Sequence, residues 1–240
     1  MHFTLDIHCH TVNSTHAYST ITENAAHAAS IGLTHIGIAD HGPGMPGGAH
    51  LYHFANLWVL PDVIGGVRVF KGAEANIMNP DGKLDLSDGI LAKMDFVIAS
   101  MHRVVIKPTD RDTHTQTLIN AMDNPHVHIL GHPIDISFDI DMTAVVAAAA
   151  RTGTIIEINE KTLDPGSYRH LDDELTLDLL KLCQQFKVQV LASSDAHFAT
   201  LVGDFPRAKA LIEQSGIDEV LVINTCEKRL MDVVAKKRRR

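Results

Sequence analysis

The sequence has little cysteine, no long apolar run and no surplus of positive charge, and each absence excludes a class of protein. Its three cysteines, Cys9, Cys183 and Cys226, cannot all pair, so a disulfide scaffold is not expected. No apolar run approaches the ~18 residues of a membrane-spanning helix. The formal net charge of −8 argues against a nucleic-acid partner, because neutralising phosphates requires an excess of lysine and arginine.

A common nucleotide-binding loop and a common hydrolase motif are also missing. No G-x-x-x-x-G-K-[ST] loop occurs, so a P-loop nucleotide site is not expected. A G-x-S-x-G elbow is absent as well, which disfavours a serine hydrolase. The first ten residues lack the features of a secretory signal, and with the odd number of cysteines this favours a cytoplasmic protein without a membrane partner.

The composition favours a single folded domain. A hydrophobic fraction of 45% against 21% charged residues allows a sizeable core, so disorder is excluded as the main state. The chain has 240 residues, close to the roughly 250 of a typical (β/α) barrel. We therefore expect one domain across residues 1–240. The sequence leaves the oligomeric state open, a homo-oligomer included.

Short apolar, β-branched runs alternate with helix-like stretches along the whole chain. The predicted strands are 3–10, 35–40, 67–73, 96–102, 128–132, 154–159, 188–194 and a weaker 219–223. The predicted helices are 23–30, 113–122, 142–151, 172–186, 205–214 and 227–237. This alternation predicts βαβ units, hence an α/β fold with a parallel sheet. Two longer stretches, 41–61 and 79–89, are interpreted as functional loops.

Histidine is the one residue whose abundance indicates a function, with 16 in the chain. It is the commonest metal ligand in proteins. The first predicted strand ends in His8-Cys9-His10, and because strand side chains alternate, both imidazoles should project to one side and Cys9 to the other.

Most of the other predicted strands also end in an imidazole or a carboxylate. These residues are Asp40, His41, Glu74, His102, His132, Asp195 and His197, and His16 lies in the loop after the first strand. In a parallel barrel the carboxyl ends of the strands form the active site, so these side chains should meet. Imidazole and carboxylate without thiolate suit Zn²⁺, Mn²⁺ or Fe²⁺, and one shared carboxylate among several histidines indicates more than one ion.

Together these positions resemble the PHP (polymerase and histidinol phosphatase) domain family, in particular its YcdX-type phosphatase branch. The motifs that carry the resemblance run in order from residue 6 to about 205: His8-Cys9-His10-Thr11, His16, Asp40-His41, Glu74, His102, Gly131-His132-Pro133 and Ser194-Asp195-Ala196-His197. The resemblance implies a distorted (β/α)₇ barrel with a site for three divalent ions, zinc first and manganese or iron as alternatives. It further implies ligand sets of His8, His10, Glu74 and Asp195 for the first ion, Glu74, His102 and His132 for the second, and His16, His41 and His197 for the third.

The chemistry that follows is hydrolysis of a small phosphorylated substrate, a phosphomonoester. A hydroxide between the first two ions would be the nucleophile, with Glu74 and Asp195 as the central carboxylates. Arg103 or Lys161 would help to hold the phosphate. Two alternatives stay open: a phosphodiesterase or nuclease-like hydrolase, and a non-catalytic metal-binding regulatory module.

Three features carry no firm assignment. Asn159 is followed by Glu160-Lys161-Thr162, where the branch tends to have small polar residues, so the roles of residues 159–161 at the site are open. The basic tail 236–240 is interpreted as a solvated helix end. His50 and His53 are assigned no metal, although they could line a substrate loop.

Overall fold

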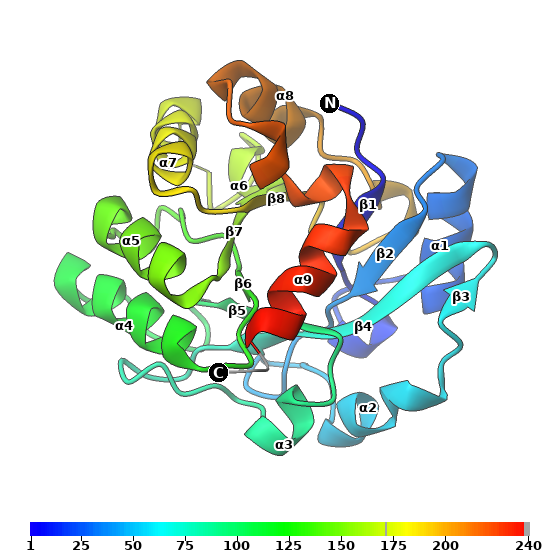
Figure 1. Cartoon of the computed structure of the whole chain (residues 1–240). Coiled ribbons are helices and arrows are strands. Elements are labelled where there is room, and N and C mark those ends of the chain that lie inside the picture. Colours follow the sequence, from blue (N-terminus) through cyan, green and yellow to red (C-terminus); the bar gives the residue numbers. More distant parts are fainter. Residues whose placement is uncertain (171, 238–240) are drawn as a thin grey trace.

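Seven parallel strands form one sheet in the order β1-β2-β4-β5-β6-β7-β8 in the computed structural model, which describes residues 1–170 and 172–237 (Figure 1). The strands are β1 (Leu5–Cys9), β2 (His35–Ile38), β4 (Val67–Asn76), β5 (Phe96–Ser100), β6 (Ile129–Leu130), β7 (Ile155–Asn159) and β8 (Val190–Ser193). All adjacent pairs along this order are parallel.

The two outer strands, β1 and β8, approach each other closely enough to almost close the sheet into a barrel. Cys9 forms an isolated parallel bridge with Ala196, just after β8. The His10 amide donates to the Ala196 carbonyl at 2.8 Å, and the Ala196 amide donates to the His8 carbonyl at 3.2 Å. The predicted distorted barrel of seven strands is therefore confirmed.

The helices lie outside the strands, apart from α9, which crosses one end of the barrel (Figure 1). They are α1 (Ile21–Ser30), α2 (Leu51–Asn56), α3 (Asp88–Leu91), α4 (Arg111–Asp123), α5 (Met142–Thr152), α6 (Glu160–Leu163), α7 (Asp173–Phe186), α8 (Pro206–Ser215) and α9 (Glu227–Lys237). Their starts follow ordinary capping chemistry: Thr20 and Glu23 form a capping box at α1, and the Asp141 side chain accepts from Ala144 N at α5.

Several sequence expectations are wrong in detail. The weak strand at 219–223 is replaced by two 3₁₀ turns, and only Val222 bridges a strand, at Val190. The predicted loop 41–61 contains α2, and 79–89 contains the start of α3. A short antiparallel strand, β3 (Val63–Ile64), was not predicted, although the Gly65-Gly66 turn that joins it to β4, with positive φ at both glycines, is a recognised hairpin signal.

The barrel interior is apolar over the first half of its strands. Leu5, Ile7, Phe70, Phe96 and Ile98 pack in one buried cluster that draws residues from or next to each of the seven strands. Phe96 fits because its ring lies where a Cβ on Gly37 or Gly72 would stand. Bulk on one strand is thus accommodated by glycine on two others.

The cluster is closed at the amino ends of the strands by α9, through Leu230, Val233 and Val234. The expectation of a solvated tail is wrong at Lys237, which is buried and whose ammonium donates to the Val127 carbonyl and, at 2.7 Å, to Thr154 Oγ1. Residues 238–240 of that tail lie outside the described residues. Within the described residues, none of the helices combines the length and apolar character that crossing a bilayer requires.

Candidate metal centre

The predicted ligands meet at the carboxyl ends of the strands, and a local irregularity in β1 aims the first two. The register of β1 against β2 shifts between Asp6 and Cys9. Ile7 packs inside the barrel, whereas Cys9 packs outside with residues of α1. The shift interrupts the strict alternation of side chains along the strand. His8 and His10 can therefore both face the barrel interior, as Ile7 does.

Glu74 lies at the centre of the histidines and faces a different group with each carboxylate oxygen. Oε1 is 3.1 Å from His132 Nε2 and 3.4 Å from His102 Nε2. Oε2 is 3.5 Å from His8 Nε2 and 2.6 Å from His41 Nδ1. Glu74 comes from inside β4, which extends past the predicted end to Asn76. Its position between the groups is that of a carboxylate able to bridge two cations.

Asp195 is the second central carboxylate. Its Oδ1 lies 3.1 Å from His10 Nε2 and 3.8 Å from His8 Nε2. Its Oδ2 pairs with Arg169 Nη2 at 2.5 Å. Arg169 is 7% exposed and was not predicted as a site residue. It comes from the irregular segment between α6 and α7, where no periodicity or motif points to it.

The remaining predicted ligands, His16, His41 and His197, lie side by side at the outer edge. The His16 ring centroid is 5.0 Å from that of His41 and 4.7 Å from that of His197. Among the described residues, the groups tight enough to hold one ion are His8-His10-Glu74, His41-Glu74-His102 and His10-His41-His197. His16 adjoins the third group without being part of it, and its side chain is exposed.

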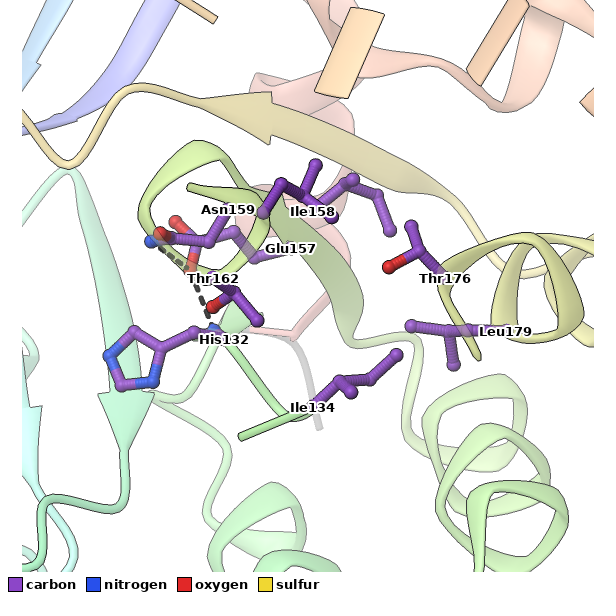
Figure 2. A pocket seen from close by; sticks show the side chains of 9 residues that line it. His132, Ile134, Glu157, Ile158, Asn159, Thr162, Thr176 and Leu179 are labelled. Carbon is purple, nitrogen blue, oxygen red and sulfur yellow. Dashed lines mark hydrogen bonds between the residues drawn. The ribbon is translucent and has the colours of Figure 1, made fainter. Parts of the chain in front are cut away.

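Buried acceptors fix several of the imidazoles from behind. His8 Nδ1 donates to Glu157 Oε1 at 2.6 Å, and Glu157 Oε2 accepts from the His132 amide at 2.6 Å. Figure 2 shows Glu157 between His132 and Asn159, with its carboxylate hydrogen-bonded to both. Because His8 carries its proton on Nδ1 and donates it to Glu157, the lone pair of its ring is on Nε2 and points into the site. Carboxylate–histidine–metal triads have the same arrangement.

Two further histidines are held in the same way. His102 Nδ1 bonds to Asn76 Oδ1 at 2.9 Å. His10 Nδ1 donates to Ser14 Oγ at 3.2 Å, and the Ser14 hydroxyl in turn donates to Asp40 at 2.7 Å. Asp40, predicted beside His41, therefore supports the site through Ser14. Glu157 and Asp40 are the orienting groups that explain why polar residues fill buried strand ends.

Several buried polar atoms of the site make no hydrogen bond, and their chemistry shows whether divalent cations fit there. His8 Nε2, His10 Nε2 and Glu74 Oε2 are buried and make no hydrogen bond in the described structure. Orphaned buried polar atoms are costly and rare in proteins. Here they converge on one another and consist of imidazole nitrogen and carboxylate oxygen, the donors that zinc, manganese and iron share. The residues therefore fit divalent ions.

The electrostatics of the site agree with that fit. Burial alone would lower the pKa of His8, but the carboxylates of Glu157, Glu74 and Asp195 raise it well above its ordinary value. Burial and the neighbouring imidazoles of His41 and His197 lower the pKa of His10 to about 3. The site thus attracts positive charge at its carboxylates while keeping His10 neutral, the form in which an imidazole binds metal.

Strained backbone also concentrates here. Of the four non-glycine residues with positive φ in the described chain, two are proposed ligands, His132 at 27° and Asp195 at 52°, and Thr15 at 46° precedes a third. Positive φ in non-glycine residues costs free energy and clusters at functional sites. His132 and Asp195 each adopt this costly conformation two residues after a strand end, at β6 and β8.

A cavity of about 280 Å³ opens beside the imidazoles. Its wall includes Arg103, Val104, Tyr168 and Arg169 in addition to the proposed ligands. The Arg103 guanidinium lies 4.8 Å from the centroid of the Tyr168 ring. Predicted Arg103 thus reaches the site mouth. Lys161 is not part of this wall in the described structure.

The residues whose role the sequence left open now have structural partners. Asn159 Nδ2 donates to Asp195 Oδ2 at 3.3 Å, and its Oδ1 accepts from the Lys161 amide. Glu160 faces away and accepts from the Ala208 amide at the start of α8.

The two histidines of the predicted loop 41–61 that were assigned no metal also have partners. His53 Nε2 lies 3.1 Å from Asp40 Oδ2, so it supports the site from behind, and His50 caps α2.

The fold and the site define the class of protein: a parallel α/β barrel with a rim of histidines and carboxylates suited to several divalent ions. The sequence matches the PHP domain family over residues 6–161, and the chain belongs to this family. It is 44% identical over 241 residues to a "Probable phosphatase" of Thermoanaerobacter sp. (strain X514), covering 100% of this chain and 98% of the relative. It is 39% identical to a "Probable phosphatase" of Clostridium botulinum (strain Langeland), covering 99% of this chain and 96% of the relative.

Two solved structures share the fold at low sequence identity. Histidinol phosphate phosphatase from Lactococcus lactis, complexed with zinc, L-histidinol and phosphate, has a TM-score of 0.60 at 15% identity, with 90% of this chain and 94% of that chain covered. A chain of archaeal ribonuclease P with mature tRNA has a TM-score of 0.58 at 16% identity, with 97% of this chain and 89% of that chain covered.

Proposed function

We propose that this protein is a metal-dependent phosphatase that hydrolyses small phosphomonoesters at a three-ion centre, with zinc as its preferred metal. One observation carries the proposal: buried imidazole and carboxylate atoms around Glu74, several of which make no hydrogen bond, converge beside a cavity lined by two arginines. The relatives named "Probable phosphatase" and the neighbour complexed with zinc and phosphate support it. The ligand sets are those expected from the sequence, with His16, His41 and His197 at the third ion.

The proposed ions supply the hydrolytic chemistry, because clustered divalent cations lower the pKa of a bound water and neutralise phosphoryl oxygens. The chain's own residues position the reaction. Glu157 and Asn76 orient His8 and His102, so that their Nε2 atoms stay aimed at Glu74. Asp195, held by Arg169 and Asn159, keeps one oxygen towards His10.

Arg169 is the group proposed to hold the phosphate. Its guanidinium stays charged, because the Asp195 carboxylate raises its pKa against the opposing effect of burial. Its Nη2 is engaged by Asp195, and the residue lines the cavity. An oxyanion in the cavity would accept from a further N–H of this guanidinium, as phosphates commonly do.

Preference for a monoester follows from the number of cations. A terminal phosphate offers three free oxygens and an extra negative charge, whereas a diester offers fewer oxygens and one charge less. Preorganised positive charge in a water-poor site is usually the largest catalytic contribution, so additional cations should favour the monoester. A cavity of about 280 Å³ also suits a small molecule.

The test is kcat/KM for phenyl phosphate and diphenyl phosphate, with the protein loaded with zinc and, separately, manganese. We expect the monoester to be the better substrate under both metals and chelation to abolish turnover. A better rate for the diester under both metals would replace this proposal with a phosphodiesterase or nuclease-like activity. Metal binding without hydrolysis of either ester would indicate a non-catalytic module.

A further inference from the structure

We infer that the alcohol part of the substrate has an apolar or planar body and carries a carboxylate, and that Arg103 selects this charge. The inference rests on the proposed phosphomonoesterase function and extends it to the class of leaving group. It is carried by the part of the cavity wall that lies outside the proposed ligand shell, formed by Met45, Pro46, Arg103, Val104, Tyr168 and Arg169.

The side chains of this wall carry more positive than negative charge. It has two guanidinium groups, and the one carboxylate lining the cavity in the described structure is that of Asp195. Asp195 is already engaged by Arg169 at 2.5 Å and lies 3.1 Å from His10. No carboxylate in this wall is therefore available to receive an ammonium group, and burying an unpaired cation beside two arginines is unfavourable.

Another acid that interacts with this wall, Asp135, lines a different cavity. Asp135 follows β6 and interacts electrostatically with Tyr168, but it lines a separate cavity together with Ile134 and Phe138. Its Oδ1 accepts from the Ser137 amide at 2.7 Å. An ammonium group on the leaving alcohol would thus meet arginine and apolar side chains at the mouth.

The two arginines have different surroundings, which separates their roles. Arg169 is buried against Asp195 and is the group proposed for the phosphate. Arg103 is exposed and lies over the Tyr168 ring at 4.8 Å, and within the described chain it forms no ion pair with a carboxylate. A guanidinium held on an aromatic ring at the mouth, with its charge unneutralised, is suited to a second anionic group of the substrate.

The apolar remainder of the wall defines the body between the two anions. Met45, Pro46, Val104 and the Tyr168 ring line the same cavity, and Tyr168 is 60% exposed. Binding of a flat or apolar group against this surface is favourable, because it removes apolar area from water. The substrate class is therefore a phosphomonoester in which a compact apolar or aromatic body separates the phosphate from a carboxylate.

The test uses three 2-phenylethylphosphonates, which mimic benzyl phosphates with CH₂ in place of the ester oxygen and cannot be hydrolysed. Calorimetry follows their binding to the metal-loaded protein. They differ only at the para position: carboxylate, hydroxymethyl or aminomethyl. We expect the carboxylate to bind about tenfold more tightly than the aminomethyl compound, with hydroxymethyl between them; tenfold corresponds to about 1.4 kcal/mol. Arg103→Gln should reduce this ratio to about threefold or less, and Arg103→Glu should reverse the order, as expected for a partly exposed charge pair.

Arg111→Gln is the matched control, because it removes one positive charge at the start of α4, outside the cavity wall. It should leave the order unchanged. Equal binding of the three phosphonates, or tighter binding of the aminomethyl compound, would overturn the inference. So would an Arg103→Gln variant that weakens all three equally, since Arg103 would then contact the phosphonate itself.

Hydrolysis of the corresponding benzyl phosphates separates this inference from the function on which it rests. In these esters the para substituent is insulated from the leaving oxygen, so kcat/KM should follow the same order. If none is hydrolysed while the binding order holds, the phosphatase proposal fails and the charge selection by Arg103 stands. If all are hydrolysed at equal rates and bind equally, the selection fails and the phosphatase proposal stands.

Discussion

The two ends of the barrel treat buried polar groups in opposite ways. At the amino ends of the strands, α9 closes an apolar cluster, and the buried ammonium of Lys237 donates to a backbone carbonyl and a threonine hydroxyl. At the carboxyl ends, His8 Nε2, His10 Nε2 and Glu74 Oε2 are buried without such partners. The Lys237 ammonium at the closed end is satisfied by hydrogen bonds of the fold, whereas the three atoms at the open end converge on positions that suit cations.

The largest expected effect lies at the open end, in Glu74→Gln. Because both carboxylate oxygens face histidines, its loss should remove metal from two ligand groups and lower kcat/KM on the order of 10³-fold with the fold retained. His16→Ala, at the exposed edge, should lose less metal and activity. Metal content by elemental analysis and phenyl phosphate turnover compare the two variants. Equal metal retention and equal activity would contradict the bridging assignment of Glu74.

The closed end should respond in stability rather than in activity. Leu230 is buried in the cluster beneath the strands, so Leu230→Ala should lower the free energy of unfolding by about 3 kcal/mol. Met231 on the same helix is 36% exposed, and Met231→Ala should cost less than about 1 kcal/mol. Urea unfolding measures both. A large loss of metal in folded Leu230→Ala protein would show that the two ends are not independent.

The smallest expected effect is on metal affinity, and it tests Glu157, which orients the proposed ligand His8 through a hydrogen bond. Glu157→Gln keeps the shape of the side chain but removes the charge that holds His8 Nδ1–H, so metal affinity should fall roughly 10- to 100-fold. Ser193→Ala is the control, since it removes another hydrogen bond to Glu157 without touching His8. Competition with a chelating dye gives both affinities. If Ser193→Ala weakened metal binding as much as Glu157→Gln, orientation of His8 would not be the role of Glu157.

The contrast between the ends also explains what the sequence could predict. His8, His10, His102 and His132 stand at or just beyond strand ends, and parallel strands bring such ends together, so a local pattern predicted a shared site. The parallel α/β sheet followed from the alternation of strands and helices, whereas the distorted barrel of seven strands was implied by the resemblance to the PHP domain family. The predicted strand at 219–223 was wrong because its apolar residues serve the core from two 3₁₀ turns.

What the sequence could not predict depends on contacts between distant segments. Arg169 belongs to an irregular stretch without periodicity, and only the folded chain brings its guanidinium to Asp195. Glu157 lies within the predicted strand 154–159, but its bonds to His8 and His132 arise only when the barrel brings other strand ends next to it. Glu160 stood beside the predicted site in sequence and in fact caps α8.

The central claim is that the open end is a metal centre, and a crystal structure of the metal-loaded protein with anomalous data at the edge of its metal tests it most directly. The account predicts about three anomalous peaks per chain, all within coordination distance of the proposed histidines and with Glu74 shared between two of them. One peak or none at neutral pH, or peaks away from His8, His10 and Glu74, would contradict it.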